Sequence, residues 1–336
     1  MAKRKTTKKT NHSSKILVYT AWSLAIVALG LSSLLIGYYF GYESANKEIA
    51  KNKALEKEKR LALLQKLEQS NKKTQESKSV NKRLKEVLQK ESKKYVSASH
   101  EIDEASLAHD PVEQKREVTR TPHRPKLAII IDDVGTRSQV KAIKTLNLPL
   151  TMSFLPPSKE RPNTPRLAAS EKNYMVHLPM EAQSFSAEEP YTLRADDSQN
   201  AISERILEIK KLFPNVKYIN NHTGSKFTSD EVAMNRLIFA LNKNSIRFID
   251  SRTTAQTQAP KVLKNFGLSY LARDIFLDHH MDKPYILEQI KKAIKVAKSH
   301  GTAIAIGHPH KNTLQALYES KHLLKDVDLV YIDKLN

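Results

Sequence analysis

The 336-residue chain contains no cysteine and only 8 glycines. The absence of cysteine excludes a disulfide scaffold, a thiolate metal site, a cysteine nucleophile and an iron–sulfur cluster. Any metal ion must therefore bind to histidine, aspartate or glutamate side chains. The chain also lacks the Gly-x-Gly-x-x-Gly and Gly-Lys-Ser/Thr loops that hold nucleotide phosphates, and it lacks a Gly-x-Ser-x-Gly nucleophile elbow. The sequence therefore contains neither of the usual phosphate-binding motifs of nucleotide-binding proteins.

The first third of the chain has few residues with which to build a core. No proline occurs before Pro111, and Tyr95 is the only aromatic residue in the stretch 43–124. Eight of the nine phenylalanines, in contrast, lie beyond residue 125. A segment so poor in large apolar side chains buries too little surface to fold by itself. We therefore expect the globular domain to be residues 126–336.

The net charge of +20 is distributed unevenly. Residues 1–125 carry 26 basic and 14 acidic side chains, whereas residues 126–336 carry 30 and 22. In the second part the cations are scattered among acids and are not interleaved with aromatic residues, which argues against a nucleic-acid groove. Much of the N-terminal positive charge precedes a long apolar segment, where Lys and Arg set membrane topology. We therefore expect no nucleic-acid partner.

Residues 16–40 form a run of 25 residues without a charged side chain. As a helix this run would be about 38 Å long, enough to cross a hydrocarbon layer of about 30 Å. A cleaved signal peptide is the alternative, but its apolar region spans only about 7–15 residues. Six cations lie in residues 1–15, which indicates that this tail is cytoplasmic. We predict a single-pass anchor in the inner membrane, with everything after residue 42 in the periplasm or outside the cell.

Residues 43–125 are rich in Lys, Glu, Gln and Ser and have sparse apolar positions. Some apolar residues fall at three- or four-residue spacing, but heptads are not sustained, and residues 70–79 interrupt them. Two interpretations stay open: a coiled-coil stalk through which chains self-associate, or a solvated tether that is partly helical or disordered. The broken heptads favour the tether.

Short apolar runs alternate with amphipathic segments beyond residue 125. Eight strands that alternate with helices predict a parallel α/β sheet or a βα barrel. In either architecture, ligands bind at the carboxyl ends of the strands. The expected strands are 127–131, 150–155, 174–178, 216–219, 246–249, 269–272, 302–306 and 329–332, and the expected helices include 138–146, 200–212, 230–242 and 285–299.

Polar side chains follow six of these strands, at the edge where such folds bind their ligands. One such residue is routinely a helix cap or a packing feature, but six at one edge predict an active site. They are Asp132 with Asp133, His177, the run Asn220-Asn221-His222, Asp250 with Ser251 and Arg252, Arg273 with Asp274, and His308.

The paired carboxylates of Asp132 and Asp133 carry the strongest single signal. Like charges so close would raise one pKa unless a cation lies nearby. A divalent ion would bind one carboxylate and leave the other free as a general base. An Asp that caps the next helix is the alternative for either residue alone. His177 is as compatible with a structural histidine as with a ligand, and a catalytic triad on Ser225 or Ser251 is the weaker alternative.

Six motifs occur in a fixed order along the domain: Asp132-Asp133, His-Leu-Pro-Met-Glu at 177–181, Asn-His-Thr-Gly-Ser at 221–225, Phe-Ile-Asp-Ser-Arg-Thr at 248–253, Arg-Asp-Ile-Phe-Leu-Asp at 273–278, and Ile-Gly-His-Pro at 306–309. In this order they resemble the divergent polysaccharide deacetylase family, over about residues 125–320. The resemblance implies an α/β fold, a distorted (β/α) barrel of seven to eight strands, related to metal-dependent polysaccharide deacetylases.

The resemblance also implies a metal site. In the related enzymes the first Asp of an Asp-Asp pair acts as base and the second binds metal, which assigns these roles to Asp132 and Asp133. Their His-x-x-x-His motif is replaced here by His177 with Glu181 at the fourth place, while His222 comes from another strand. The implied cofactor is a divalent metal, Zn²⁺ foremost, on Asp133, His177, His222 and Glu181.

The remaining implied roles belong to His308 as the acid, with Asp250 and Arg273 orienting His308 or the base. The resulting hypothesis is a membrane-anchored, extracytoplasmic hydrolase that removes N-acetyl groups from an envelope polysaccharide. Because a fold does not fix a function, the alternative is a non-catalytic envelope module that binds a glycan or a protein on the same scaffold.

Overall fold

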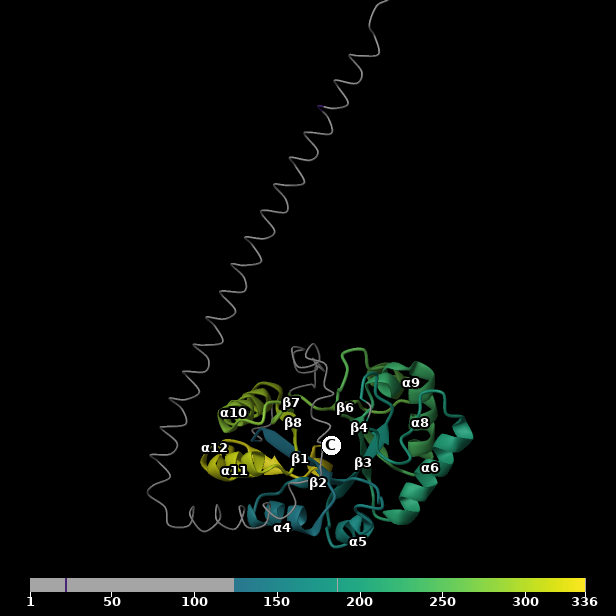
Figure 1. Cartoon of the computed structure of the whole chain (residues 1–336). Helices are drawn as coiled ribbons and strands as arrows, with labels where there is room; N and C mark the ends of the chain where they lie inside the picture. The colour runs from purple at the N-terminus through teal and green to yellow at the C-terminus, as the bar shows by residue number, and fades with distance from the viewer. Residues whose placement is uncertain (1–21, 23–123, 186, 336) are drawn as a thin grey trace, which may run out of the picture. The chain divides into compact units, whose positions relative to one another are not determined.

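The computed structural model describes Trp22, residues 124–185 and residues 187–335. The predicted tail (1–15), anchor (16–40) and stalk (43–125) lie outside the described residues, Trp22 and residues 124–125 excepted, and they stay predictions. Within the part of the chain that the structure describes, no helix is both long and apolar enough to cross a membrane. The domain predicted for residues 126–336 is described almost completely (Figure 1).

A parallel sheet forms the centre of the domain. Its strands follow the order β6-β5-β4-β3-β2-β1-β8-β7, and β9 pairs with the first residues of β1. Helices connect most successive strands, as parallel pairing requires. The described strands are β1 (Lys126–Val134), β2 (Thr151–Phe154), β3 (Tyr174–Met180), β4 (Tyr218–Thr223), β5 (Arg247–Asp250), β6 (Leu271–Ala272), β7 (Ile275–Phe276), β8 (Thr302–Gly307) and β9 (Asp328–Val330).

The two ends of this strand order are joined through the chain itself. The short strands β6 and β7 are separated only by Arg273 and Asp274. The amide of Arg273 donates to the Asp250 carbonyl of β5 (2.9 Å), and the amide of Asp274 donates to the Ile304 carbonyl of β8 (2.8 Å). The segment 271–276 therefore bridges β5 and β8, so that the sheet curls on itself in the manner of a distorted barrel.

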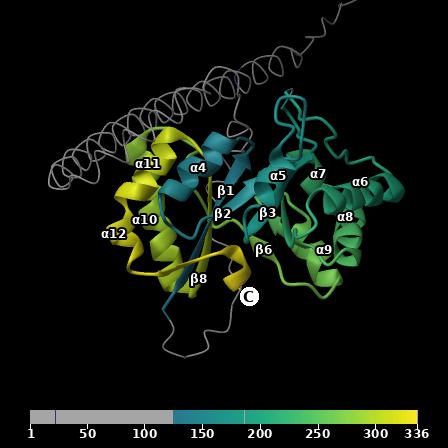
Figure 2. The ribbon, with the colours of Figure 1, turned by 90° about the horizontal axis from the view of Figure 1, so that it is seen from below.

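Helices cover the outside of the curled sheet (Figures 1 and 2). Three of them, α10 to α12, lie on the side of β8, and α6, α8 and α9 lie on the side of β4 to β6. The described helices are α4 (Arg137–Thr145), α5 (Thr164–Ala168), α6 (Gln199–Leu212), α7 (Ser225–Ser229), α8 (Glu231–Lys243), α9 (Ala259–Asn265), α10 (Lys283–His300), α11 (Lys311–Glu319) and α12 (Lys321–Leu324).

The side chains of β1 alternate between two cores, as a strand dictates. Leu127, Ile129 and Ile131 join the large core between sheet and helices, whereas Ala128 and Ile130 join a smaller one. The smaller core collects residues from β1 and from β3 to β8 but none from an α-helix, so it lies inside the curl. Every one of these five side chains is at most 1 % exposed.

The inner core is closed at the amino-terminal ends of the strands by the end of the chain. A 3₁₀ turn, η2 (Ile332–Lys334), follows β9 and contributes Ile332 to the inner core, and Leu335 joins it. The amide of Ile332 also donates to Thr151 Oγ1 (3.1 Å) at the start of β2. Because these residues cover the amino-terminal ends, a binding site inside the curled sheet of the described domain must open at the carboxyl ends of the strands.

The four expected helices are confirmed, with ends within two residues of the expectation. The strands differ more. β4 covers 218–223 instead of 216–219, and β1 runs on to Val134, so Asp132, Asp133 and the 220–222 run lie inside strands and not after them. The ladder hydrogen bonds continued further than the apolar run because the sheet is buried on both faces there. The strand expected over 269–272 is shortened to β6, and β7 is an additional strand that was not expected, which gives nine strands in the described domain instead of seven or eight.

Candidate functional site

An irregularity at the end of β1 brings two carboxylates to one place. Between two paired positions β1 advances by three residues while β2 advances by two, which is the signature of a β-bulge. Asp133 has a φ of 57°, in the left-handed region that Asp tolerates better than most residues. The bulge interrupts the strict alternation of the strand, and both Asp132 and Asp133, each 2 % exposed, contact the same histidine, His177.

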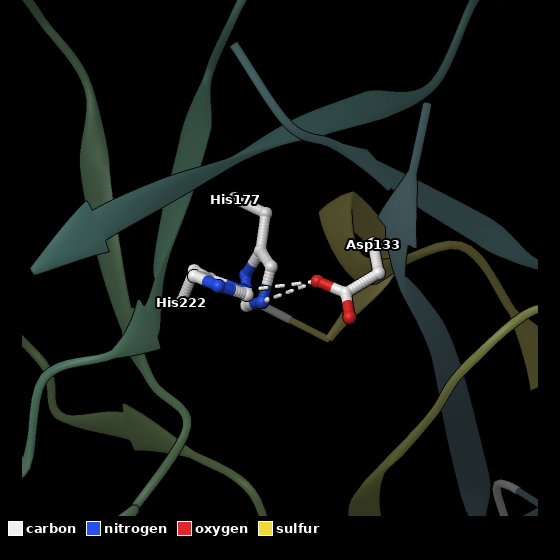
Figure 3. Close-up of side chains that lie close together, drawn as sticks. All are labelled: Asp133, His177 and His222. Atoms are coloured by element: carbon white, nitrogen blue, oxygen red, sulfur yellow. Dashed lines mark hydrogen bonds and ion pairs between the residues drawn. The ribbon is translucent and has the colours of Figure 1, made fainter. Parts of the chain in front are cut away.

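Asp133 faces His177 of β3 and His222 of β4 (Figure 3). Its Oδ1 lies 3.0 Å from His222 Nδ1 and 3.5 Å from His177 Nε2. The two imidazole rings lie 4.9 Å apart in an edge-to-face arrangement. One candidate ligand atom from each of the three buried residues lies within 4.8 Å of the other two. The expectation that these three residues come together is therefore met.

The chemistry of this group fits a divalent cation. Asp133 Oδ2 and His177 Nδ1 are buried and have no hydrogen-bond partner among the described residues, which native proteins seldom tolerate. Burial opposes the charge of Asp133, but His222, His308 and His177 together hold its pKa below its usual range. Burial and the neighbouring His222 lower the pKa of His177 to about 3. An ionised carboxylate beside a neutral imidazole is the donor set that binds metals such as Zn²⁺.

Asp132 lies beside this group and is held by an amide. Asn220 Nδ2 donates to both carboxylate oxygens, at 3.0 and 2.8 Å, and also to Ser251 Oγ at 3.0 Å. His177 Nδ1 lies 3.6 Å from Asp132 Oδ2. Burial raises the pKa of Asp132 to about 7, against smaller opposing contributions from its neighbours. A carboxyl group with a pKa near neutrality is suited to accept and release a proton.

His308 follows β8 and approaches the group from the other side of the barrel. Its Nε2 lies 3.7 Å from Asp133 Oδ2, while its Nδ1 lies 3.1 Å from Asp278 Oδ1. The amide of His308 donates to Asp278 Oδ2 (2.7 Å). Burial by itself lowers the pKa of His308, but Asp278 outweighs it and raises this pKa to about 9. The ring is therefore protonated at neutral pH, the state that a general acid requires.

Glu181, expected as a fourth metal ligand, is not part of the group. One of its oxygens accepts hydrogen bonds from Lys226 Nζ (2.8 Å) and Arg194 (3.2 Å), and the other accepts from the amide of Ala195 (3.0 Å). The physical reason is the strand: four residues span about 13 Å in β conformation, so Glu181 cannot stand beside His177 as it would on a helix. This expectation is corrected.

Asp250 and Arg273, expected to orient His308 or the base, lie further out. The Asp250 carboxylate accepts from the amide of Arg252, from Thr257 Oγ1 and from Tyr270 OH, and it lies on the outer face of β5. Arg273 Nε donates to the Ser251 carbonyl (2.7 Å), so it reaches Asp132 only through Ser251 and Asn220. Direct contact of either side chain with Asp132 or His308 is absent from the hydrogen bonds and ion pairs of residues 124–185 and 187–335.

Sequence reasoning gave no individual role to two residues at the site, Asn220 and Asp278. Asn220 also accepts a hydrogen bond from Ser153 Oγ (2.6 Å), which fixes the amide so that its NH₂ group faces Asp132. The signal that could have found it is alternation, because Tyr218, in the inner core, is two residues earlier on β4. In the same way, Asp278 comes two residues after Phe276 of β7, whose side chain also belongs to the inner core.

Fold and site together define an α/β-barrel domain with a buried carboxylate–histidine group at the carboxyl edge of its strands. The family model for divergent polysaccharide deacetylases matches residues 129–336, and the chain belongs to this family. The resemblance found in the motifs is thereby confirmed.

Two curated relatives and one solved structure that are similar to the chain are themselves uncharacterised proteins. An uncharacterised protein of Haemophilus influenzae is 33 % identical over 213 residues, covering 62 % of this chain and 76 % of that protein. The uncharacterised protein YibQ of Escherichia coli is 36 % identical over 222 residues, covering 62 % and 67 %. Among solved structures, an uncharacterised protein of Agrobacterium tumefaciens has a TM-score of 0.56 at 18 % identity, over 64 % of this chain and 90 % of that one. This last similarity supports the fold alone.

Proposed function

We propose that the domain is a metal-dependent hydrolase that removes N-acetyl groups from an envelope polysaccharide. The observation that carries the proposal is the arrangement around Asp133. Its Oδ1 contacts His177 and His222, its Oδ2 faces His308, and Asp132 precedes it on the same bulge. A ligand group is thus flanked by one side chain poised as a base and one poised as an acid.

Asp133, His177 and His222 would hold the metal, which when bound supplies Lewis-acid polarisation of a carbonyl and lowers the pKa of a nearby water. Asp132 accepts a proton from water as the water oxygen attacks the carbonyl carbon of the N-acetyl group. The C–N bond then breaks, and His308 Nε2 donates a proton to the departing nitrogen. Acetate and a free amine result.

The pKa values of Asp132 and His308 define the pH range in which the base is ionised and the acid is protonated. Asp132 is ionised above about 7, and His308 is protonated below about 9. We therefore expect the rate to be highest between these values. The lower limit moves downward when a cation is bound, since a nearby positive charge favours the carboxylate.

Different observations support the proposed substrate class and the proposed location of the domain. Membership in the divergent polysaccharide deacetylase family supports an acetylated polysaccharide. The apolar run 16–40 with its basic flank supports a single-pass anchor that holds the domain on the outer side of the inner membrane, where envelope glycans lie. The stalk 43–125 would then give the domain its reach.

The test combines metal content with acetate release from acetylated glycans. We expect about one Zn²⁺ per chain in purified protein, with turnover, and loss of both in Asp133→Ala and His177→Ala. Glu181→Gln is the matched control, because it changes a buried carboxylate outside the group and should retain the ion and the activity. Folded wild-type protein that binds no divalent ion would exclude the mechanism. Metal binding without turnover on any acetylated glycan would favour the glycan-binding module.

A further inference from the structure

A second group of potential ligands lies next to the first. Asp278 follows β7, His308 follows β8, and His310 is the N-cap residue of α11. One ligand atom from each lies within 4.8 Å of the other two. The proposed hydrolysis uses Asp278 and His308, but it gives His310 no role.

His310 has a feature that demands an explanation. Its Nε2 is buried and has no hydrogen-bond partner among the described residues. As N-cap of α11 it makes no side-chain capping hydrogen bond either. Its ring lies 5.7 Å from that of His308, tilted by 39°. A buried, unpaired imidazole nitrogen beside a carboxylate and a second imidazole is a typical element of a metal site.

We propose that Asp278, His308 and His310 form a second, weaker divalent-cation site, and that an ion bound there inhibits the hydrolase by occupying His308. The inhibitory part rests on the proposed function, whereas the site itself does not. The atoms Asp278 Oδ1 and His308 Nδ1 lie 3.1 Å apart. Two ligands that each bind Zn²⁺ at about 2.0–2.2 Å in tetrahedral geometry are separated by about 3.4 Å, so only small shifts are needed.

The contacts explain why this site binds more weakly than the first. An ion must break the hydrogen bond between Asp278 and His308 and displace the proton on Nδ1. Asp278 Oδ2 is already taken by the His308 amide and by Thr313 Oγ1 (2.6 Å). The carboxylate of Asp133 separates the two groups, and two dications on either side of it repel each other.

Inhibition follows from occupancy of the His308 ring. In the proposed hydrolysis Nε2 faces the Asp133 group, 3.7 Å from Asp133 Oδ2, while Asp278 Oδ1 holds Nδ1 at 3.1 Å. An ion on Nδ1 replaces this contact with Asp278 and draws the ring toward Asp278 and His310, away from the position in which Nε2 donates its proton. Excess metal should therefore suppress turnover while the Asp133 group keeps its ion.

The experiment is titration calorimetry with Zn²⁺ of the full-length protein in detergent, after a chelator has removed any bound metal, together with acetate release at rising Zn²⁺. Wild type should show one tight and one weak site. His310→Asn, which keeps a good N-cap residue, should lose the weak site only and need about tenfold or more Zn²⁺ for inhibition. Asp133→Ala should lose the tight site and keep the weak one.

His322→Gln, at an exposed histidine, serves as control for histidine removal, and His310→Gln is the second variant if the first is unstable. A single site in wild type, or a weak site and an inhibition that survive both changes at His310, overturns the inference and leaves the proposed function intact. Loss of the tight site from wild type, with the weak one present, would overturn the proposed function alone.

Discussion

The Asp278 carboxylate is the partner that keeps His308 charged. In Asp278→Asn the ring loses its anionic partner, while burial, which lowers its pKa, remains. A hydrogen bond to a charged group contributes about 1.5–3 kcal/mol. We therefore expect the pKa of His308 to fall from about 9 by roughly one to two pH units. Titration of the imidazole by NMR in metal-free protein measures it.

The control for this prediction is Thr313→Val. This change removes a neutral donor to the same carboxylate but keeps its charge. It should move the pKa of His308 much less than Asp278→Asn does. Equal shifts in the two variants would show that the hydrogen-bond network, and not the charge of Asp278, sets the pKa.

Asp132 should make the metal-free protein less stable as pH rises. Burial raises its pKa from 3.8 to about 7, so the folded protein holds the proton where the unfolded chain has lost it. Its contribution is full below pH 4 and is lost as pH rises through 7. Asp132→Asn escapes this loss, and its stability advantage should grow from little at pH 4 to on the order of 4 kcal/mol above pH 7.

Chemical denaturation in a chelating buffer at several pH values tests this prediction. Asp196→Asn, at an exposed carboxylate, is the control for removing a negative charge. An advantage of Asp132→Asn that does not change between pH 4 and 8 would contradict the raised pKa. The same variant should have lost its turnover, because the base is gone.

Alternation along strands decides which polar residues reach the site. On β5, Ile249 belongs to the inner core and Phe248 to the outer one, so Asp250 follows the outer parity and misses the site. On β4, Tyr218 belongs to the inner core, and Asn220, two residues later, lies on the same face of the strand and therefore reaches the site. Choosing residues by their place after a strand gives Asp132, Asp133, His177, His222 and His308, which the structure brings together, but it overlooks this parity. It therefore includes Asp250 and gives no role to Asn220.

The turn after β4 depends on a glycine. Gly224 has a φ of 94°, and a Cβ there would lie 3.0 Å from Met180 Cβ. Gly301→Ala is the matched control, because Gly301 has a φ of 80° and open space around it. We expect Gly301→Ala to cost about 1–2 kcal/mol for the left-handed backbone alone, and Gly224→Ala to cost about 1 kcal/mol more from the clash. Denaturant unfolding measures both values.

Gly224→Ala should also weaken Zn²⁺ binding, because His222 lies two residues before the strained turn, whereas Gly301→Ala should leave it unchanged. Equal losses of unfolding free energy in the two variants would show that Met180 yields without cost. A loss of stability without a loss of affinity would show that the turn does not fix His222.

Helices with a capping side chain were the ones that the sequence could reveal. The four helices predicted correctly, α4, α6, α8 and α10, are preceded by N-cap residues whose side chains each accept a hydrogen bond from a backbone amide: Thr136, Ser198, Asp230 and Asp282. The helices without a prediction, α5, α7, α9, α11 and α12, make no side-chain capping hydrogen bond. These helices depend on packing against the rest of the domain, which the periodicity of the sequence does not reveal.

The candidate site exists only at the scale of the whole curled sheet. Asp132 and Asn220 are 88 residues apart, and Asp133 and His222 are 89 apart. Motif order could gather these residues into one site, but it could not show that Glu181 turns to Lys226 and Arg194. It also could not show that segment 271–276 joins β5 to β8, since two-residue strands have no pattern of their own. Those features depend on contacts between distant parts of the chain.

The predicted anchor would hold the whole molecule at the membrane. Deletion of residues 1–42 removes the 25 uncharged residues and their basic flank, yet it leaves every described strand and helix of the domain. We expect the deletion to move the protein from the membrane pellet to the supernatant and to keep Zn²⁺ binding, because the Asp133 group draws on the domain alone. Deletion of 70–79, inside the stalk, is the control and should keep the protein in the pellet. Protease added outside intact inner membranes should digest the domain of the full chain, since the predicted topology leaves only residues 1–15 inside. A domain protected from that protease would reverse the predicted topology and remove envelope glycans from its reach.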